Sequence, residues 1–184
     1  ALKQVKEFPP NKDEFKKAVQ KAKAYIKSGE IFQVDLSQKF ERKTLTSSTN
    51  IYRSLRRINP SPYLFHLKFQ EFDIIGSSPE MMVNVNQKIV NIRPIAGTRK
   101  RGKNDEEDKI LSKDLLADEK EKAEHLMLVD LGRNDVGRVS KIGSVNVTEF
   151  MQIEKYSHVM HIVSNVTGKL SSSHDNYDAL MSGF

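Results

Sequence analysis

Apolar residues recur at helical spacing in the first part of the chain. Between Phe15 and Ile26 they fall three or four positions apart, which places them on one face of a helix. Asn11 and Glu14 match the capping-box pattern in front of this run, and Gly29 is a typical residue just after a helix. The pattern therefore predicts an amphipathic helix between Asn11 and Gly29 with one buried stripe.

The pattern changes to a period of two after this helix. Apolar and polar residues alternate over 31–40, which predicts a half-buried strand with Gln33 on its polar face. A helix is predicted over 49–58, before Pro60 and Pro62. The two prolines favour an extended or turning connection, because the residue before a proline disfavours the helical conformation.

The rest of the chain alternates between strand-like and helical segments. Two helices are predicted over 105–138 and divide at Asp118, which forms a second capping box with Glu121. Asn86 and Gln87 suit a hairpin turn. The other predicted elements are strands over 63–69, 73–77, 81–86, 88–93, 144–154 and 158–170 and a short helix from about 175. This order indicates an α+β fold with mostly antiparallel sheets and helices packed outside.

Composition is that of a globular protein. The 184 residues are 38% hydrophobic and 29% charged, with a mean hydropathy of −0.55, which excludes a disordered chain. The absence of cysteine excludes disulfide bonds and thiol catalysis. No uncharged apolar run reaches about 18 residues, and the chain does not start with a signal-peptide core. We therefore expect no membrane segment and a cytoplasmic location.

The net charge of +6 would attract a polyanionic partner. The densest basic cluster, 99–103, is not flanked by the aromatic side chains that stack on single-stranded nucleic acid. We interpret this cluster as solvated surface and expect no nucleic acid among the partners. A basic nucleic-acid-binding module is the alternative from a different functional class, and it rests only on the charge and this cluster.

Gly97 and Thr98 begin a segment, 97–104, that approaches the phosphate-binding loop pattern. Asn104 occupies the position where that pattern requires serine or threonine, and Pro94 is unsuited to the buried strand that precedes such a loop. What remains is a glycine turn with a hydroxyl and exposed amides. Such a turn can bind a carboxylate or a phosphate.

Glu121 and Glu124 lie three positions apart on the second of the two adjacent helices, so their carboxylates project from one face. Mg²⁺ takes one or two protein carboxylates and completes its shell with water and substrate oxygens, so this pair is a candidate metal site. An exposed charged face, with Glu121 closing the capping box, is the alternative. His125 fits a packed histidine better than a ligand.

Glu80 and His161 are two further candidates. Glu80 follows a turn-forming segment, 76–79, and its carboxylate is expected at the end of a strand, although an exposed glutamate without a role is the alternative. His161 shares a strand face with Val159 and Val163, so it points either to a core or to a cleft. A hydrogen-bonded core histidine is the commoner outcome.

Six blocks of sequence have a recognisable order. They are GEIFQVDLSQ (29–38), NPSPYLF (59–65), GSSPE (76–80), IRPIAGTRKRG (92–102), DEKEKAEHLMLVDLGRNDVGRVS (118–140) and HVMHIVSNVTGKL (158–170). Together they resemble the anthranilate synthase component I branch of the chorismate-utilising enzyme family, over nearly the whole chain from about Asn11. In that family an amino-terminal regulatory part precedes this region, and an SGAPK segment begins where this chain stops. The resemblance implies that 1–184 is a single partial catalytic domain, truncated at its carboxy-terminal side and inactive alone.

The activity implied by the resemblance is that of a lyase of tryptophan biosynthesis that needs Mg²⁺ and converts chorismate. Ammonia, supplied by a glutamine amidotransferase subunit, adds to the ring while the ring hydroxyl leaves, and elimination of pyruvate then gives anthranilate. By the same resemblance, Glu124 and Glu121 hold Mg²⁺, with Glu124 the more secure ligand. Gly97 and Thr98 bind the ring carboxylate.

The resemblance also implies roles for Glu80 and His161. Glu80 matches the general acid that protonates the departing hydroxyl, a role that needs a protonated carboxyl group. His161 matches a histidine that lies beside the ring and assists the elimination of pyruvate.

Other positions discriminate within the family. Gln33 stands where relatives that add water to chorismate carry a lysine base, and glutamine cannot accept that proton, which favours ammonia as the nucleophile. Ala96 stands where many aminodeoxychorismate synthases carry a lysine nucleophile. We therefore favour anthranilate synthase, with aminodeoxychorismate synthase component I of folate biosynthesis as the alternative. In feedback-inhibited members, tryptophan binds at a segment that corresponds to Pro62, Tyr63 and Leu64.

Overall fold

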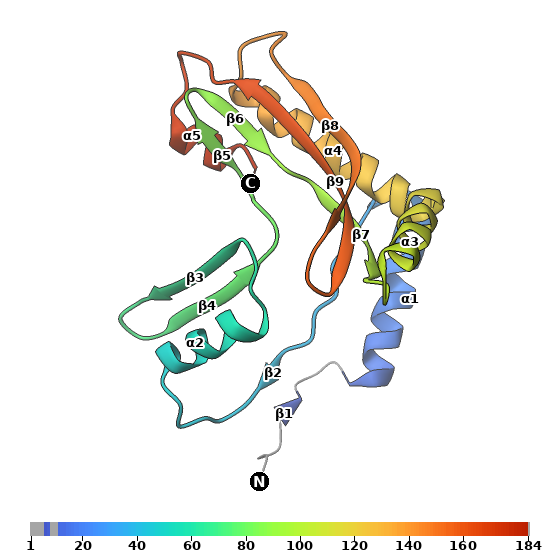
Figure 1. The fold of residues 1–184 in the computed structure, drawn as a ribbon, viewed down its shortest axis with the longest axis vertical. Coiled ribbons are helices and arrows are strands. Elements are labelled where there is room, and N and C mark those ends of the chain that lie inside the picture. The colour runs from blue at the N-terminus through green and yellow to red at the C-terminus, as the bar shows by residue number, and fades with distance from the viewer. Residues whose placement is uncertain (1–5, 8–10, 184) are drawn as a thin grey trace. The chain divides into compact units, whose positions relative to one another are not determined.

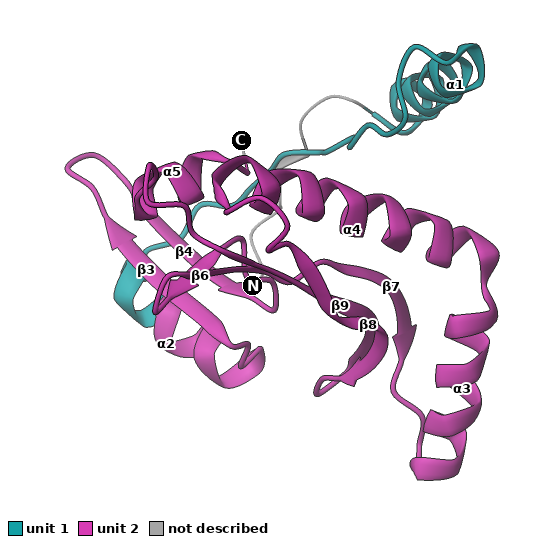
Figure 2. Cartoon of the chain, turned by 90° about the horizontal axis from the view of Figure 1, so that it is seen from above, with its two compact units in different colours: residues 1–51 teal, residues 52–184 magenta. Residues whose placement is uncertain are grey.

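The computed structural model describes residues 6–7 and 11–183 (Figure 1). The chain divides into two compact units, unit 1 over residues 1–51 and unit 2 over residues 52–184 (Figure 2). In the described ranges, none of the helices has both the length and the apolar character needed to cross a membrane.

Unit 1 contains the predicted first helix. Helix α1 (Lys12–Ser28) begins with the capping box, in which the Asn11 side chain accepts from the backbone of Glu14 and the Glu14 side chain accepts from the Asn11 backbone. Gly29 ends the helix in a left-handed conformation, with φ of 80°. The signals at both ends of this helix are therefore confirmed.

The predicted strand over 31–40 is wrong. Unit 1 has one short antiparallel pair, β1 (Lys6–Glu7) and β2 (Phe40–Glu41), and within the described residues no partner strand pairs with 31–39. The alternating pattern suits a strand, but a strand also needs a neighbour for its backbone hydrogen bonds. Phe32, at 89% exposure, illustrates the result.

Unit 2 holds a hairpin of β3 (Tyr63–Lys68) and β4 (Asp73–Ser78). Helix α2 (Ser48–Ile58) precedes it and contacts it: the ring centroids of Tyr52 and His66 lie 5.6 Å apart. The Ser77 hydroxyl donates to the carbonyl oxygen of Asn59 at 2.6 Å, which ties the end of α2 to β4. These elements match the predicted helix and strands.

The larger sheet is antiparallel throughout and is organised around its last strand, β9 (Figure 1). Strand β8 pairs along residues 160–167 of β9, while β6 pairs with 166–169 and β7 with 159–163. Gln87 and Lys88, both at positive φ, form the β5–β6 turn one residue later than predicted. The strands are β5 (Asn84–Asn86), β6 (Ile89–Ile92), β7 (Ile95–Lys100), β8 (Asn146–Lys155) and β9 (Val159–Lys169).

Two helices cover this sheet, and a third follows the last strand. Helix α3 (Asp105–Ala117) packs against β7 and β9, and α4 (Glu119–Val139) packs against β9, β7 and β6. Helix α5 (Asn176–Met181) contacts α4. The core under α4 consists of Val90, Val129, Val136, Val139, Val166, Leu170 and Ala179, and the core under α3 of Leu115, Met160 and Ile162. The predicted α+β class with antiparallel sheets and outer helices is confirmed.

Helix α4 approaches β9 closely at its carboxy-terminal end. A Cβ at Gly168 would lie 2.3 Å from the Ser140 hydroxyl and 2.6 Å from Val136. A Cβ at Gly132, in the middle of α4, would instead meet its neighbours at 3.5 Å, an ordinary contact distance. The absence of a side chain at Gly168 is therefore what allows α4 to rest on the strand.

Candidate active site

A β-bulge in β7 forms the centre of the candidate site. Ala96 pairs with Ile162 and Arg99 pairs with Met160, so Gly97 and Thr98 together oppose a single residue of β9, His161. Gly97 has φ of 68°, the left-handed conformation that glycine adopts without steric strain. The bulge therefore places two predicted carboxylate-binding residues directly across from the predicted catalytic histidine.

The imidazole of His161 is hydrogen-bonded to the bulge. Its Nδ1 atom lies 2.8 Å from the carbonyl oxygen of Gly97 and 3.2 Å from the hydroxyl oxygen of Thr98. A carbonyl oxygen only accepts hydrogen bonds, so Nδ1 is the donor. His161 is half-buried on the strand face opposite Met160 and Ile162, which face the core under α3.

Glu121 approaches the bulge from α4. One of its carboxylate oxygens, Oε2, lies 3.3 Å from the position that a Cβ on Gly97 would occupy. The predicted capping box at the start of α4 forms only in part. Asp118 accepts from the amides of Lys120 and Glu121, but its own amide already donates to Asp114 and Leu115 at the end of α3. The Glu121 carboxylate is therefore not used in the cap and is directed toward Gly97.

Glu124 lies one turn further along α4, and its carboxylate forms no hydrogen bond or ion pair with another described residue. Its oxygens and those of Glu121 are the donor type that a hard divalent cation prefers. Over the described ranges, no cluster of three or more acidic or histidine side chains is gathered around a point where a metal could bind. Two such carboxylates could form part of a Mg²⁺ site, in which water and substrate oxygens would complete the shell.

The basic cluster 99–103 is only in part the solvated surface we expected, because Lys100 and Lys103 are exposed whereas the two arginines are paired. Arg99 forms ion pairs with Asp114 and Asp118 at 2.7 and 2.9 Å, and Arg101 pairs with the buried Asp108 at 2.7 Å. The hydrogen bond from Arg101, together with that from the Gly102 amide, holds the pKa of Asp108 well below its ordinary value. These pairs fasten α3 to the end of β7 and leave two of the cluster's cations committed to the fold.

His125 is a packed histidine, as predicted. It is fully buried, and its Nε2 lies 2.7 Å from the Ser164 hydroxyl, which also accepts the amide of Met151 at 2.9 Å. Burial lowers the pKa of His125, so the neutral form is favoured. The contact joins α4 to β9 and β8 one residue after Glu124.

Glu80 lies in unit 2 just after β4, with an exposed side chain. It lines a groove of about 170 Å³ together with Pro94 and Asp135. Pro94 leads directly into β7, so this groove lies next to the strand that carries the bulge. No described hydrogen bond or ion pair joins the Glu80 carboxylate to Gly97, Thr98 or His161.

The remaining predicted positions belong to other segments of the chain. Gln33 is exposed in an irregular segment of unit 1. Pro62, Tyr63 and Leu64 lie where α2 is followed by β3. Leu64 is half-buried, whereas Pro62 and Tyr63 are exposed, Tyr63 to 42%. Their predicted roles remain predictions.

The sequence patterns did not single out a network beside His161. Tyr156 packs its ring against the imidazole and donates its hydroxyl to Glu154, which pairs with Arg93. Arg93 also pairs with Glu149 at 3.0 Å. Two acidic residues on a strand, and an arginine just after another strand, were a signal in the sequence, because partly buried charges need partners.

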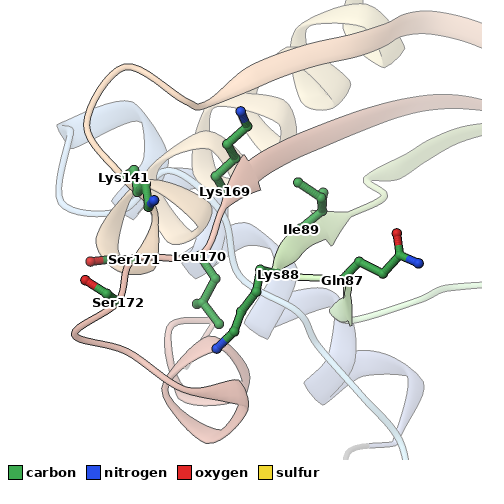
Figure 3. Close-up of a pocket in the computed structure, with 8 residues that line it drawn as sticks. All are labelled: Gln87, Lys88, Ile89, Lys141, Lys169, Leu170, Ser171 and Ser172. Atoms are coloured by element: carbon green, nitrogen blue, oxygen red, sulfur yellow. The ribbon is translucent and has the colours of Figure 1, made fainter.

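A separate pocket of about 410 Å³ lies at the other end of the sheet (Figure 3). Lys88, Lys141 and Lys169 line it, and Figure 3 shows their ammonium groups pointing in different directions. Charges that diverge in this way do not form a focused anion site. None of the predicted site residues lines this pocket.

Comparisons with known proteins agree on the kind of protein that this chain is similar to. A family model described as chorismate binding enzyme matches residues 3–184. Anthranilate synthase component 1 of Aquifex aeolicus is 57% identical over 173 residues, which cover 94% of this chain and 35% of that protein. Aminodeoxychorismate synthase component 1 of Bacillus subtilis is 53% identical over 176 residues, which cover 96% of this chain and 37% of that protein.

A solved structure is similar as well. The crystal structure of anthranilate synthase component I from Streptococcus pneumoniae matches with a TM-score of 0.87 at 44% sequence identity, and the match covers 97% of this chain and 39% of that one. The chain thus spans 35% and 37% of the length of the two curated relatives named above.

Proposed function

Because this chain belongs to the family of chorismate binding enzymes, we propose that the full-length protein carries out the anthranilate synthase reaction on chorismate. Ammonia adds to the ring as the ring hydroxyl leaves, and elimination of pyruvate then yields anthranilate. The observation that carries this proposal is the β7 bulge, where Gly97, Thr98 and His161 meet and where Glu121 approaches from α4.

Each predicted site residue has a role that its chemistry supports. The Thr98 hydroxyl, exposed beside His161, binds the ring carboxylate together with the Gly97 turn. Glu80 transfers its proton to the departing hydroxyl, which leaves as water. Glu121 and Glu124 would hold Mg²⁺, whose charge neutralises a substrate carboxylate.

The aminodeoxychorismate synthase reaction is the second candidate, because a relative with that name is 53% identical. Ala96 favours anthranilate, since a methyl side chain cannot attack the ring as a lysine nucleophile does. Ala96 is also buried, paired with Ile162 on β9. The nature of the product distinguishes the two candidates.

The partners follow from the same proposal. Ammonia comes from a glutamine amidotransferase subunit, and tryptophan acts as an inhibitor that contacts Pro62, Tyr63 and Leu64. The enzyme works in the cytoplasm as part of tryptophan biosynthesis.

The test uses the full-length protein incubated with chorismate, MgCl₂ and ammonium, with anthranilate followed by fluorescence and pyruvate by a coupled assay. We expect both products and their loss when EDTA removes the metal. Glu124→Ala and Glu80→Ala should each lower turnover at least about a hundredfold, which corresponds to about 2.7 kcal/mol of barrier. Glu119→Ala is the matched control, because Glu119 is exposed on the same helix and, among the residues that the structure describes, pairs only with Lys122.

Two results would contradict the proposal. Aminodeoxychorismate formed without pyruvate would move the protein to the second candidate, and full activity in Glu124→Ala would remove the metal assignment. We also expect the 184 residues alone neither to convert chorismate nor to bind it tightly.

A further inference from the structure

We propose that Tyr156, held by Glu154 and Arg93, is a positioning residue that fixes the His161 imidazole with its proton on Nδ1 and with Nε2 unprotonated. This inference rests on the proposed function for its consequence in catalysis. The protonation pattern itself follows from the contacts of the ring.

The bulge determines which ring nitrogen carries the proton. Nδ1 of His161 lies 2.8 Å from the Gly97 carbonyl oxygen, and an unprotonated nitrogen at that distance would set two lone pairs against each other. The Thr98 hydroxyl oxygen, 3.2 Å away, is a second acceptor for the same proton. A neutral imidazole has one proton, so Nε2 keeps its lone pair.

Tyr156 restrains the orientation of this ring from the side. The two ring centroids lie 5.5 Å apart with the planes inclined at 61°, an edge-to-face contact. The Tyr156 hydroxyl donates to Oε2 of Glu154 at 2.7 Å. Burial, together with the hydrogen bond to Glu154, raises the pKa of Tyr156 to about 12, so the hydroxyl stays protonated and remains a donor.

Glu154 is held in turn by Arg93, which lies between β6 and β7. Arg93 pairs with Glu154 and with Glu149 on the same strand, β8. Burial alone would raise the pKa of Glu154, but the hydrogen bonds from Tyr156 and Arg93 outweigh it and lower the pKa. Glu154 is also the residue of β8 that lies opposite His161 in the β8–β9 register, so Glu154 is adjacent to the imidazole that Tyr156 orients.

The backbone of Tyr156 is anchored independently. Arg101 donates to the Tyr156 carbonyl oxygen at 2.8 Å, and the Tyr156 amide donates to the Val159 carbonyl oxygen at 2.8 Å. Arg101 is itself paired with Asp108 on α3. Both the hydroxyl end and the backbone of Tyr156 are therefore fixed to different elements of the sheet and its helices.

The consequence concerns the elimination step. Nε2 can accept the proton from the ring carbon as the C–H electrons complete the aromatic ring and the bond to the enolpyruvyl oxygen breaks. The released enolpyruvate takes up a proton and becomes pyruvate, so no further reactant is needed. Tyr156 does not touch the reacting atoms in this scheme; it keeps the accepting nitrogen free and correctly turned.

The direct test is the protonation pattern of His161 in the full-length protein labelled with ¹⁵N-histidine. Two-bond ¹H–¹⁵N correlation spectra at about pH 8.5, where an ordinary imidazole is neutral, report which nitrogen carries the proton. A His161→Asn variant assigns the signal. We expect the proton on Nδ1 in the unmodified protein and a mixture of both forms in Tyr156→Leu.

The kinetic test separates positioning from a general effect on stability. Tyr156→Leu should raise the ratio of released aminated intermediate to anthranilate by about tenfold, because one hydrogen-bonded support of the imidazole is lost. The KM for chorismate should be unchanged. Tyr156→Phe, which keeps the ring but loses the bond to Glu154, should give a smaller rise of about threefold. Tyr177→Phe, at an exposed tyrosine on α5, is the matched control and should behave as the unmodified protein.

Three results overturn the inference. The first is a proton on Nε2 in the unmodified protein, and the second is an unchanged protonation pattern and product ratio in Tyr156→Leu. The third result applies if Tyr156→Leu does not fold: it is an unchanged product ratio in both Tyr156→Phe and Glu154→Gln. A protein that makes no anthranilate would contradict the proposed function, while the spectra would still decide the state of His161.

Discussion

Gly97 carries three constraints at one residue. Its φ of 68° allows the bulge, and its carbonyl oxygen accepts a hydrogen bond from Nδ1 of His161. The space beside its Cα is occupied by Glu121 and Leu115. A Cβ at this position would lie 3.0 Å from the nearest Leu115 carbon and 3.3 Å from a Glu121 oxygen. Conformation and close packing therefore both require glycine.

Replacing Gly97 should cost more than replacing a glycine that has only the unusual conformation. Gly143, with φ of 76° and no atom near its missing Cβ, is the matched control. We expect Gly143→Ala to lower the free energy of unfolding by about 1 kcal/mol and Gly97→Ala by about 2–3 kcal/mol, measured by urea denaturation. Equal losses would show that the neighbours of Gly97 yield without cost.

Asp108 makes a pH dependence predictable. Its pKa in the folded chain is lowered by the bond from Arg101, so its ionised form stabilises the fold fully above its ordinary pKa of about 4. This contribution is lost as the pH falls from that value toward the lower folded pKa. We expect acid unfolding curves of the unmodified chain to show this loss and those of Asp108→Asn to lack it; parallel curves for the two proteins would refute the assignment.

At the scale of elements, the position of α4 on the sheet decides where its carboxylates lie. The helix starts at Asp118, is tied to β9 through His125 and Ser164, and rests on Gly168 at its far end. These three contacts are spread along the helix, so both its rotation and its distance from β9 are determined. Glu121 and Glu124 are oriented by the whole helix rather than by their own contacts.

The close approach at Gly168 can be tested with a second glycine as reference. Gly168→Ala should destabilise the chain by about 3 kcal/mol, because the new methyl group would overlap Ser140 and Val136. Gly132→Ala meets only ordinary contacts and sits inside a helix, so we expect no loss or a gain of up to about 1 kcal/mol. Thermal unfolding of both variants measures the difference, and a tolerated Gly168→Ala would mean that α4 can lift from β9.

The elements with strong local signals were predictable, and the contacts between them were not. The caps at Asn11 and Gly29 and the division at Asp118 depend on neighbouring residues and were found from the sequence. The strand over 31–40 failed because pairing depends on a partner that the local pattern does not contain. The family resemblance had named Gly97 and His161, but their hydrogen bond spans 64 positions and depends on the register and the bulge of β7.

At the scale of the whole chain, a notable feature is apolar surface on the β3–β4 hairpin. Leu64 and His66 point toward the α2 side, where Tyr52 packs, and the alternate residues form what we call the outer hairpin face. Its large residues are between 37% and 49% exposed: Tyr63, Phe65, Leu67 and Ile74. Contiguous apolar surface of this kind tends to bind other apolar surface.

We therefore expect the 184-residue chain to self-associate through the outer hairpin face. Sedimentation velocity over a range of concentrations should show oligomers, and Leu67→Lys should weaken the association at least about tenfold. Ile142→Lys is the control, because Ile142 is fully exposed in a loop outside this face. A concentration-independent monomer for the unmodified chain would contradict the expectation.

Asp118 ends one helix and starts the next, and this has a consequence for how such chains can change in evolution. Each residue turns an α-helix by about 100°. A single residue inserted or deleted between Asp118 and Glu121 would displace the Asp118 cap by that angle, and one between Glu121 and His125, which is held by Ser164, would swing the Glu121 carboxylate away from Gly97. Loops elsewhere, such as 141–145 between α4 and β8, can change length without moving that carboxylate. In an alignment of homologues, the stretch from Asp118 to Glu124 should therefore be free of gaps even where its other side chains vary.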